Sequence, residues 1–202
     1  RDLVRSRGLG DVYKRQIMGN CSIGNRKLPI YCVDLSKKTN LDTSKKYVSI
    51  SFDAAWGDED TIKILDILDK YNIKTTFFMT GGWVEKYPED VKAIQAAGHD
   101  LGNHSENHKN MAQLSTEEQK TEIMTVHEKV KQLTGVDMQL FRPPYGRIKP
   151  SQAHRLSERY HIVMWDVLSR DYSHLISPRT CLHNVTKHVK GGSIVVFHDS
   201  VK

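Results

Sequence analysis

The eleven residues GHDLGNHSENH, at positions 98–108, contain three histidines, a glutamate and an aspartate. His104 and His108 are four positions apart, so one helical turn or a tight loop would place both imidazoles on one side, as in histidine pairs that bind a divalent metal. This spacing alone is equally compatible with solvated loop histidines. For His99, which precedes the pair, we expect a packing or hydrogen-bonding role.

Two further stretches carry side chains suited to electrostatic and proton-transfer chemistry. In FRPPYG, two prolines restrict the backbone, so Arg142 is held in a preset direction and Pro144 leaves the Tyr145 N–H pointing outward from a rigid turn. A plain strand-ending turn explains the same letters equally well. In VVFHDS an apolar strand ends in His198, whose ordinary pKa of about 6.5 suits proton transfer at neutral pH, with capping as the alternative role.

Hydrophobic periodicity predicts alternating strands and helices from Tyr47 onward. In the first helix, the apolar residues Ile62, Leu65, Ile67 and Leu68 recur at helical spacing. The expected strands cover 47–53, 74–80, 99–103, 138–142, 161–167 and 192–199, and the expected helices cover 58–71, 85–98, 115–135, 150–159 and 177–189.

Three positions mark helix ends in this pattern. Gly98 suits a left-handed cap, because glycine has no Cβ, and the helix over 115–135 ends at Gly135. Ser115 and Glu118 have the spacing of a capping box, which satisfies N–H groups in the first helical turn.

Strands that alternate with helices imply an α/β fold with parallel pairing through right-handed crossovers. Periodicity alone leaves open a small or incomplete barrel and an open doubly wound sheet. The reactive side chains fall at or after the carboxyl ends of the strands, where parallel α/β folds build their sites. These residues are Asp53, His104, Arg142, Asp166, Asp171 and His198.

Composition places the chain among globular proteins. Its 202 residues are 38% hydrophobic and 27% charged, enough for one domain with a substantial core. Half of the net charge of +6 comes from residues 1–16, and no Lys/Arg run with interleaved aromatics occurs, so we expect no nucleic-acid partner. Cys21, Cys32 and Cys181 contain no C-x-x-C pair, which argues against a zinc knuckle or a disulfide framework.

The amino-terminal region lacks the apolar run of a secretion signal, and the longest apolar run, IVVF, is too short to span a bilayer. We expect residues 1–16 to be a leader or non-native, residues 1–45 to be a loop-rich segment, and the folded domain to cover 46–202. The sequence is silent on oligomeric state.

From about Lys46 to Lys202 the chain resembles the polysaccharide deacetylases, which form carbohydrate esterase family 4 and share the NodB homology domain. The resemblance rests on five ordered motifs: SFDAAWGDEDT, NHSENH, FRPPYG, WDVLSRDY and VVFHD. It implies a distorted, incomplete (β/α) barrel. It also implies metal-assisted removal of acetyl groups from sugars, in the bacterial cell envelope or as a secreted protein.

The resemblance also implies roles for individual residues. His104 and His108 would bind a divalent metal, most simply zinc, with cobalt, nickel or manganese as alternatives. Asp53 would be the general base and His198 the acid that protonates the leaving group. Arg142, paired with Asp171, would orient Asp53. The Tyr145 N–H would hold the oxyanion, and Pro144 and Trp165 would line the substrate pocket, although core packing is the simpler role for Trp165.

The chain departs from the family pattern in several places. Ala54 stands where a metal-binding aspartate is usual, so we expect weaker metal binding unless Asp58, Asp60 or water takes its place. Leu168 stands where an aspartate is common, and Tyr172 where a tryptophan is common. Relatives continue beyond the equivalent of Lys202, so the resemblance implies a C-terminal truncation.

The expected function is hydrolysis of acetyl groups from N-acetylated cell-wall or chitin-like polysaccharide, such as peptidoglycan. Two alternatives remain: a non-catalytic glycan-binding module of the same fold, and an O-acetyl esterase of xylan-like polymers. The sequence does not indicate which glycan or linkage is recognised, because substrate loops carry no readable code.

Overall fold

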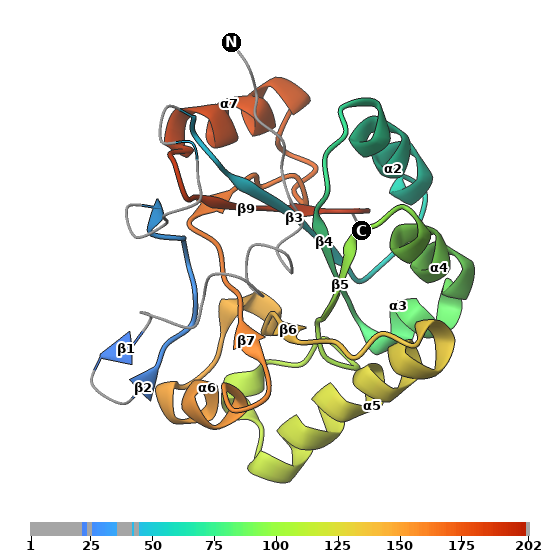
Figure 1. Cartoon of the computed structure of the whole chain (residues 1–202), viewed down its shortest axis with the longest axis vertical. Helices are drawn as coiled ribbons and strands as arrows, with labels where there is room; N and C mark the ends of the chain where they lie inside the picture. The colour runs from blue at the N-terminus through green and yellow to red at the C-terminus, as the bar shows by residue number, and fades with distance from the viewer. Residues whose placement is uncertain (1–21, 24–25, 36–41, 43–44, 201–202) are drawn as a thin grey trace.

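The computed structural model describes residues 22–23, 26–35, 42 and 45–200. The expectations for residues 1–16 and for Cys21 lie outside these described residues. Figure 1 shows the arrangement of the helices and strands. The strands are β1 (Ser22–Ile23), β2 (Arg26–Lys27), β3 (Ser49–Ala54), β4 (Thr76–Met79), β5 (Asp100–Asn103), β6 (Leu140–Phe141), β7 (His161–Ile162), β8 (Val167–Leu168) and β9 (Ile194–His198). The α-helices are α2 (Thr61–Lys70), α3 (Gly81–Lys86), α4 (Pro88–Ala96), α5 (Thr116–Thr134), α6 (Pro150–Leu156) and α7 (Pro178–His188), and the short 3-10 helices are η2 (Met111–Gln113) and η3 (Pro144–Gly146).

Within the described residues, seven parallel strands form one sheet in the order β7-β6-β5-β4-β3-β9-β8. The sheet curls into a half-barrel with its helices outside (Figure 1). The prediction of an α/β fold with parallel pairing is confirmed. Of the two architectures that periodicity left open, the structure has the incomplete barrel.

One predicted strand is two strands in the structure. The run 161–167 divides into β7 and β8, which lie at opposite ends of the seven-stranded sheet. Residues 163–166 therefore cross the open side of the half-barrel, where Ile30 pairs with Val163 and Cys32 pairs with Ser193. An apolar run gives the same pattern whether it extends one strand or crosses between two, so periodicity could not separate them.

Two helices differ from their predicted form. The run predicted as one helix over 85–98 contains the end of α3, which already begins at Gly81, and all of α4, because Pro88 has no backbone N–H and starts a new helix after Tyr87. In α2, Leu65 and Leu68 are buried as predicted. Ile62 and Ile67 are exposed, because the buried stripe follows Thr61, Leu65 and Leu68 at spacings of four and three.

The predicted helix ends are confirmed. Gly98 and Gly135 have positive φ angles of 79° and 75°, in the left-handed region that a Cβ disfavours. Ser115 and Glu118 form both hydrogen bonds of the capping box at the start of α5. These ends fix the direction in which the chain enters β5 and leaves α5.

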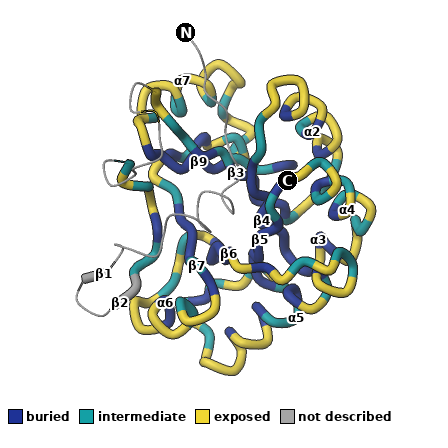
Figure 2. Tube along the Cα trace, viewed as in Figure 1, coloured by how far each residue is buried: buried dark blue, intermediate teal, exposed yellow. Residues whose placement is uncertain are grey.

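The core lies between the sheet and the surrounding helices. Figure 2 shows the strands of the seven-stranded sheet as largely buried and the outer helix faces as exposed. Phe52, Phe77, Trp83, Ile94 and Val126 belong to the largest apolar cluster. Ile30 joins a second cluster with Phe78 and Val163, so residues before the predicted domain start at 46 contribute to the core.

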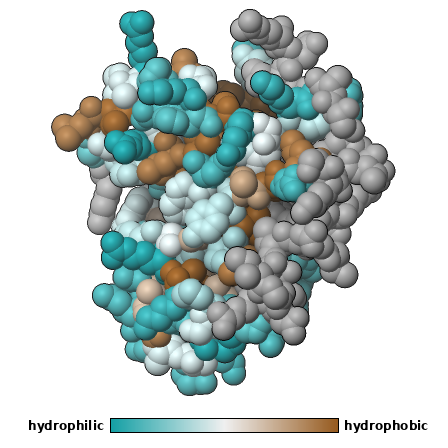
Figure 3. Space-filling model, turned by 90° about the vertical axis from the view of Figure 1, so that its left-hand side faces the viewer, coloured by the Kyte–Doolittle hydropathy of each residue, from teal (hydrophilic) through white to brown (hydrophobic). Residues whose placement is uncertain are grey.

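On the face shown in Figure 3, apolar residues are interspersed with hydrophilic ones. Among the described residues, no helix combines the length and the apolar character needed to cross a membrane.

Candidate active site

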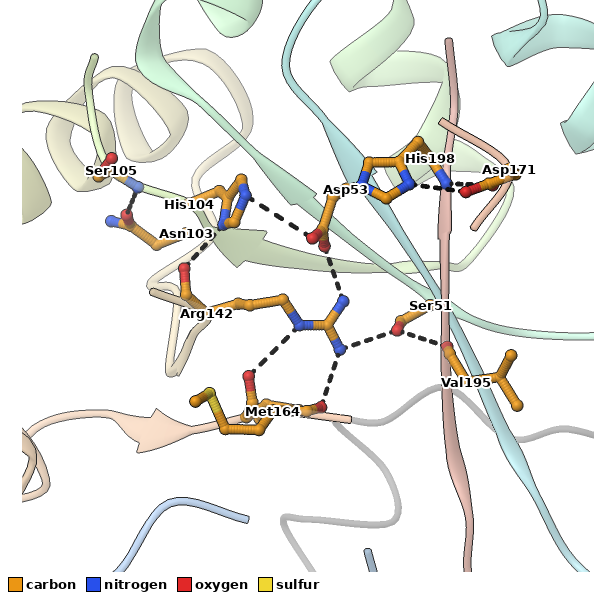
Figure 4. A network of polar contacts seen from close by, with 11 residues as sticks. Ser51, Asp53, Asn103, His104, Ser105, Arg142, Met164, Asp171, Val195 and His198 are labelled. Atoms are coloured by element: carbon orange, nitrogen blue, oxygen red, sulfur yellow. Dashed lines mark hydrogen bonds and ion pairs between the residues drawn. The ribbon is translucent and has the colours of Figure 1, made fainter. Parts of the chain in front are cut away.

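The centre of the candidate site lies on two adjacent strands. Asp53 on β3 and His198 on β9 are register partners near the carboxyl ends of those strands. Figure 4 shows both side chains together with those of His104 and Arg142. The register explains how residues 145 positions apart in the sequence come together, because parallel neighbours at one register point to the same face of the sheet.

Arg142 is fully buried below Asp53 and uses its guanidinium to make four hydrogen bonds. Nη1 donates to Asp53 Oδ1 at 2.7 Å, and Nη2 donates to Ser51 Oγ at 2.8 Å. Nε and Nη2 donate to the carbonyl oxygens of Val163 and Met164, in the segment that crosses the open side of the barrel. A planar guanidinium can hold all four acceptors at fixed angles, so Arg142 fixes the orientation of Asp53.

The predicted pair of Arg142 with Asp171 is wrong. Asp171 Oδ1 lies 2.8 Å from His198 Nδ1, and its Oδ2 accepts a hydrogen bond of 2.7 Å from the His198 backbone N–H. Asp171 follows β8, which pairs with β9, whereas Arg142 follows β6 on the far side of the sheet. Asp171 therefore orients His198, and Arg142 orients Asp53.

Asp166 does not join the site. Its carboxylate accepts hydrogen bonds from Ile194 N and Ser193 Oγ, at the beginning of β9 and so at the opposite end of the barrel. The prediction placed Asp166 at the end of a strand because 161–167 read as one strand. It lies instead just before β8.

His104 and His108 face each other in the loop after β5. Their ring centroids are 4.9 Å apart. His104 Nδ1 lies 2.7 Å from the Arg142 carbonyl oxygen, and since that oxygen can only accept, Nδ1 carries the proton. His104 Nε2 then presents its lone pair toward the site, 3.7 Å from Asp53 Oδ2.

The histidine pair is suited to a metal, although its ligand set is small. Among the described residues, His108 Nδ1 is buried without a hydrogen-bond partner. Burial lowers the pKa of both imidazoles, that of His108 to about 4, so both are neutral at pH 7 as metal ligands must be. The same described residues contain no cluster of three or more His, Cys, Asp or Glu arranged to hold a metal. The residues present therefore fit a two-histidine site in which other ligands complete the coordination.

Among the residues that the structure describes, the aspartate expected at position 54 has no evident substitute. Ala54 is fully buried in the largest apolar cluster. Asp60 forms an ion pair with Lys63 at 2.7 Å, and Asp58 lies beside Asp90, whose pKa is raised by burial and by this neighbouring carboxylate. Both carboxylates are engaged away from the histidine pair, so the structure gives no support to their replacing the missing ligand.

Charges and burial set the protonation states of the two central residues. Burial raises the pKa of Asp53, but the Arg142 guanidinium and the nearby imidazoles lower it by more, so the carboxyl is ionised at neutral pH. Burial lowers the pKa of His198, but the hydrogen bond with Asp171 and the charge of Asp53 raise it by more. One group is thus ready to accept a proton and the other to donate one.

The residues expected around the substrate occupy different environments. Tyr145 is exposed and has a φ of 59°, which is unusual for a residue with a Cβ. The centroid of its ring lies 4.7 Å from the centroid of the His108 ring. Pro144 is buried beside it. Trp165 is half-buried, packs against the second apolar cluster and lies 5.6 Å from the Arg142 guanidinium.

Two residues near the site were not predicted. Ser51 accepts from Arg142 and donates to the Val195 carbonyl, and it lies two positions before Asp53 on the same face of β3, so strand alternation could have found it. Trp56 is exposed and its ring lies 5.7 Å from that of His108. The position of Trp56 depends on a loop without regular structure, for which the sequence offers no periodicity.

Several known proteins are similar to this chain. A peptidoglycan-N-acetylglucosamine deacetylase of Bacillus cereus is 35% identical over 158 residues, which is 78% of this chain and 57% of that protein. The peptidoglycan-N-acetylmuramic acid deacetylase PdaC of Bacillus subtilis is 28% identical over 95% of this chain and 41% of its own length. The chain thus spans less than two thirds of the length of these relatives.

Among solved structures, BA3943 from Bacillus anthracis, described as a CE4 family pseudoenzyme, superposes with a TM-score of 0.77 at 29% identity, covering 86% of this chain and 59% of that one. A mutant of BA3943 is described as having restored enzymatic activity. Residues 40–162 match the family model for polysaccharide deacetylase. The chain therefore belongs to the polysaccharide deacetylase family.

Proposed function

We propose that this chain is a metal-dependent hydrolase that removes acetyl groups from N-acetylated cell-wall polysaccharide. One observation carries the proposal: the ionised Asp53 lies beside His104 of the histidine pair and beside His198 on the neighbouring strand. The His198 ring is in turn held by the carboxylate of Asp171. Deacetylation of an amide needs a base to activate water and an acid to protonate the amine. The site holds one candidate for each task.

The reaction can be followed through the protein's own groups. Asp53 accepts a proton from the attacking water, whose oxygen adds to the acetyl carbon. Arg142 keeps the Asp53 carboxylate ionised and correctly turned, through the 2.7 Å hydrogen bond. When the C–N bond breaks, the imidazolium of His198 donates its proton to the leaving amine, and acetate is released. The Tyr145 N–H is the proposed donor to the oxyanion, a kind of contact that contributes about 3 kcal/mol in comparable sites.

His104 and His108 would hold the metal. When bound, a divalent ion such as zinc polarises the acetyl carbonyl and lowers the pKa of a bound water. The hydrogen bond from His104 Nδ1 to the Arg142 carbonyl fixes the ring so that Nε2 can act as the ligand. Because no carboxylate stands at position 54, affinity for the metal should be weaker than in relatives that have one.

The proposed substrate is acetylated peptidoglycan, and the proposed location is the cell envelope or the outside of the cell. Support comes from the names of the similar proteins, which include deacetylases of N-acetylglucosamine and N-acetylmuramic acid in peptidoglycan. Exposed aromatic rings beside the site, those of Trp56, Tyr145 and Tyr172, suit the apolar faces of sugar rings.

A second candidate is a glycan-binding module without turnover. It is favoured by one observation, the buried Ala54 in place of a carboxylate, together with the similarity to a family member described as a pseudoenzyme. The arrangement of Asp53, Arg142, Asp171 and His198 favours the enzyme, because a binding module has no need of an oriented base and acid.

Acetate release distinguishes these candidates. The protein would be incubated with N-acetylglucosamine oligomers, peptidoglycan and acetylated xylan, with and without a chelator, beside an Asp53→Asn variant. Chelator-sensitive release from the N-acetylated substrates that Asp53→Asn abolishes supports the proposed enzyme. Binding without acetate release would establish the module, and release from xylan alone would establish an O-acetyl esterase.

A further inference from the structure

The loop that carries His104 and His108 is attached to helix α5 by a buried carboxylate. Glu122 is 4% exposed and faces the loop from the first half of α5. Its Oε2 accepts a hydrogen bond of 2.8 Å from the backbone N–H of Asn107, and its Oε1 accepts one of 2.9 Å from Asn107 Nδ2. Lys109 Nζ lies 3.0 Å from the same Oε1. Glu122 therefore bonds to the residues on both sides of His108.

The two histidines are oriented by different means. The His104 ring is fixed directly, since its Nδ1 donates to the Arg142 carbonyl. His108 Nδ1 has no hydrogen-bond partner among the described residues, so this ring is held by its backbone and by packing against the rings of Trp56 and Tyr145. That backbone has a φ of 52°, a conformation that costs energy for a residue with a Cβ and persists only where neighbouring contacts impose it.

From these contacts we infer that Glu122 is a positioning residue for the metal site, which holds His108 toward His104 by fixing the backbone of Asn107. The inference rests on the proposed function of the histidine pair. Glu122 does for His108 through the main chain what the Arg142 carbonyl does for His104 through the ring. Partners of this kind, one step removed from the metal, typically change metal affinity by about 10- to 100-fold when they are lost.

Other contacts of the loop do not replace this one. Gly81 N donates to the Ser105 carbonyl at 3.1 Å, and Lys129 binds the Glu106 side chain. Both contacts act on the part of the loop between the histidines. Among the described residues, only Glu122 accepts a hydrogen bond from the main chain next to His108.

The charge of Glu122 is consistent with this role. Burial raises its pKa, but the hydrogen bonds of Asn107 and the charge of Lys109 lower it by more. The group is therefore ionised at neutral pH, and it accepts stronger hydrogen bonds than a neutral amide would.

Zinc affinity provides the first test. Dissociation constants for Zn²⁺ would be measured by competition with a chromophoric chelator for the wild type, Glu122→Gln and Glu122→Ala. The control is Glu117→Gln, an exposed glutamate on the same helix. We expect affinity to fall about 10-fold in Glu122→Gln, which keeps one acceptor, and up to about 100-fold in Glu122→Ala. Affinities of both variants equal to that of the control would overturn the inference.

Histidine ring NMR spectra of the metal-free proteins provide a second, independent test. His127 lies on α5 five residues after Glu122, and its ring is held by Tyr160 and Asp137, so it reports movement of the helix itself. In Glu122→Gln the ring signals of His108 should shift while those of His127 stay in place. Equal shifts of both rings, or none in His108, would contradict the positioning role.

The two tests separate failure of the inference from failure of the proposed function. A wild type that binds no zinc would contradict the proposed metal site, and the metal-free spectra would still show whether Glu122 orients His108. A wild type that binds zinc, with Glu122 variants that bind it equally well, would contradict only the inference.

Discussion

Arg142 makes hydrogen bonds to two site residues at once, one through its side chain and one through its backbone carbonyl group. Its guanidinium donates to Asp53, and its carbonyl oxygen accepts from His104 Nδ1, both at 2.7 Å. The proposed base and one proposed metal ligand are therefore fixed to a single residue, whose backbone is restricted by the following Pro143. Any change that moves the backbone of Arg142 should disturb both groups together.

The first prediction concerns the Arg142 side chain. Arg142→Lys removes the planar fork, so Ser51 and the carbonyl groups of Val163 and Met164 lose donors in a buried site. We expect the free energy of unfolding to fall by about 2–4 kcal/mol and acetate release to fall at least about 100-fold. Urea unfolding and initial rates measure the two effects. Arg147→Lys, at an exposed position, is the control, and near wild-type behaviour of both variants would refute the orienting role of Arg142.

The pH dependence of activity should report the state of His198. The proposed acid must be protonated, so activity should fall as pH rises through the pKa of His198, which Asp171 helps to raise. In Asp171→Asn this contribution is lost, so the alkaline limb of the kcat/KM profile should move to lower pH. An unchanged alkaline limb in a variant of reduced activity would show that another group controls it.

The missing carboxylate can be supplied at position 54. Ala54→Asp should tighten zinc binding by about 10-fold or more, because an anionic ligand joins two neutral imidazoles. The metal-free variant should be less stable by about 1–3 kcal/mol, because Ala54 is fully buried among apolar side chains. Chelator competition and thermal unfolding measure these opposite effects. Ala55→Asp, one position further on, is the control, and equal zinc affinity in the two variants would argue against a ligand role at position 54.

Stability should depend on pH through buried neutral histidines. His99 Nδ1 accepts a hydrogen bond from Thr75 N, and burial together with the charge of Lys74 lowers the His99 pKa to about 4. Unfolded histidine titrates at about 6.5, so between these values the unfolded state binds more protons. Stability should therefore fall as pH decreases from about 6.5 to 4, by up to about 1.4 kcal/mol per pH unit for this group.

The variant His99→Asn isolates the contribution of His99 from those of other buried histidines. Asparagine Oδ1 takes the place of Nδ1 and can still accept from Thr75 N, but asparagine does not titrate, so the unfolding free energy of this variant, measured in urea between pH 4 and 7, should have a shallower pH dependence. A slope equal to that of the wild type would show that His99 does not remain neutral in the fold.

The sequence predicted those parts of the fold and site that depend on local pattern. The helix ends at Gly98, Ser115 and Gly135 follow from backbone chemistry and are confirmed. The convergence of Asp53, His104 and His198 follows from parallel strand ends meeting at one edge. The proposed roles of these residues remain predictions.

Parts of the site that depend on long-range contacts could not be predicted in the same way. Whether Asp171 bonds Arg142 or His198 depends on the strand order β9-β8 at one end of the sheet, which periodicity does not contain. The division of 161–167 into β7 and β8 has the same cause. Glu122 reads as an ordinary polar position in a helix, and its importance appears only once α5 lies against the loop of Asn107.

The most direct test of the proposed function is the zinc content of the purified protein beside that of His104→Ala, after equilibration with zinc and removal of excess metal. We expect bound zinc in the wild type and a loss of most of it in the variant, with both proteins folded by circular dichroism. Equal zinc content in the two proteins would contradict a metal site built on the histidine pair.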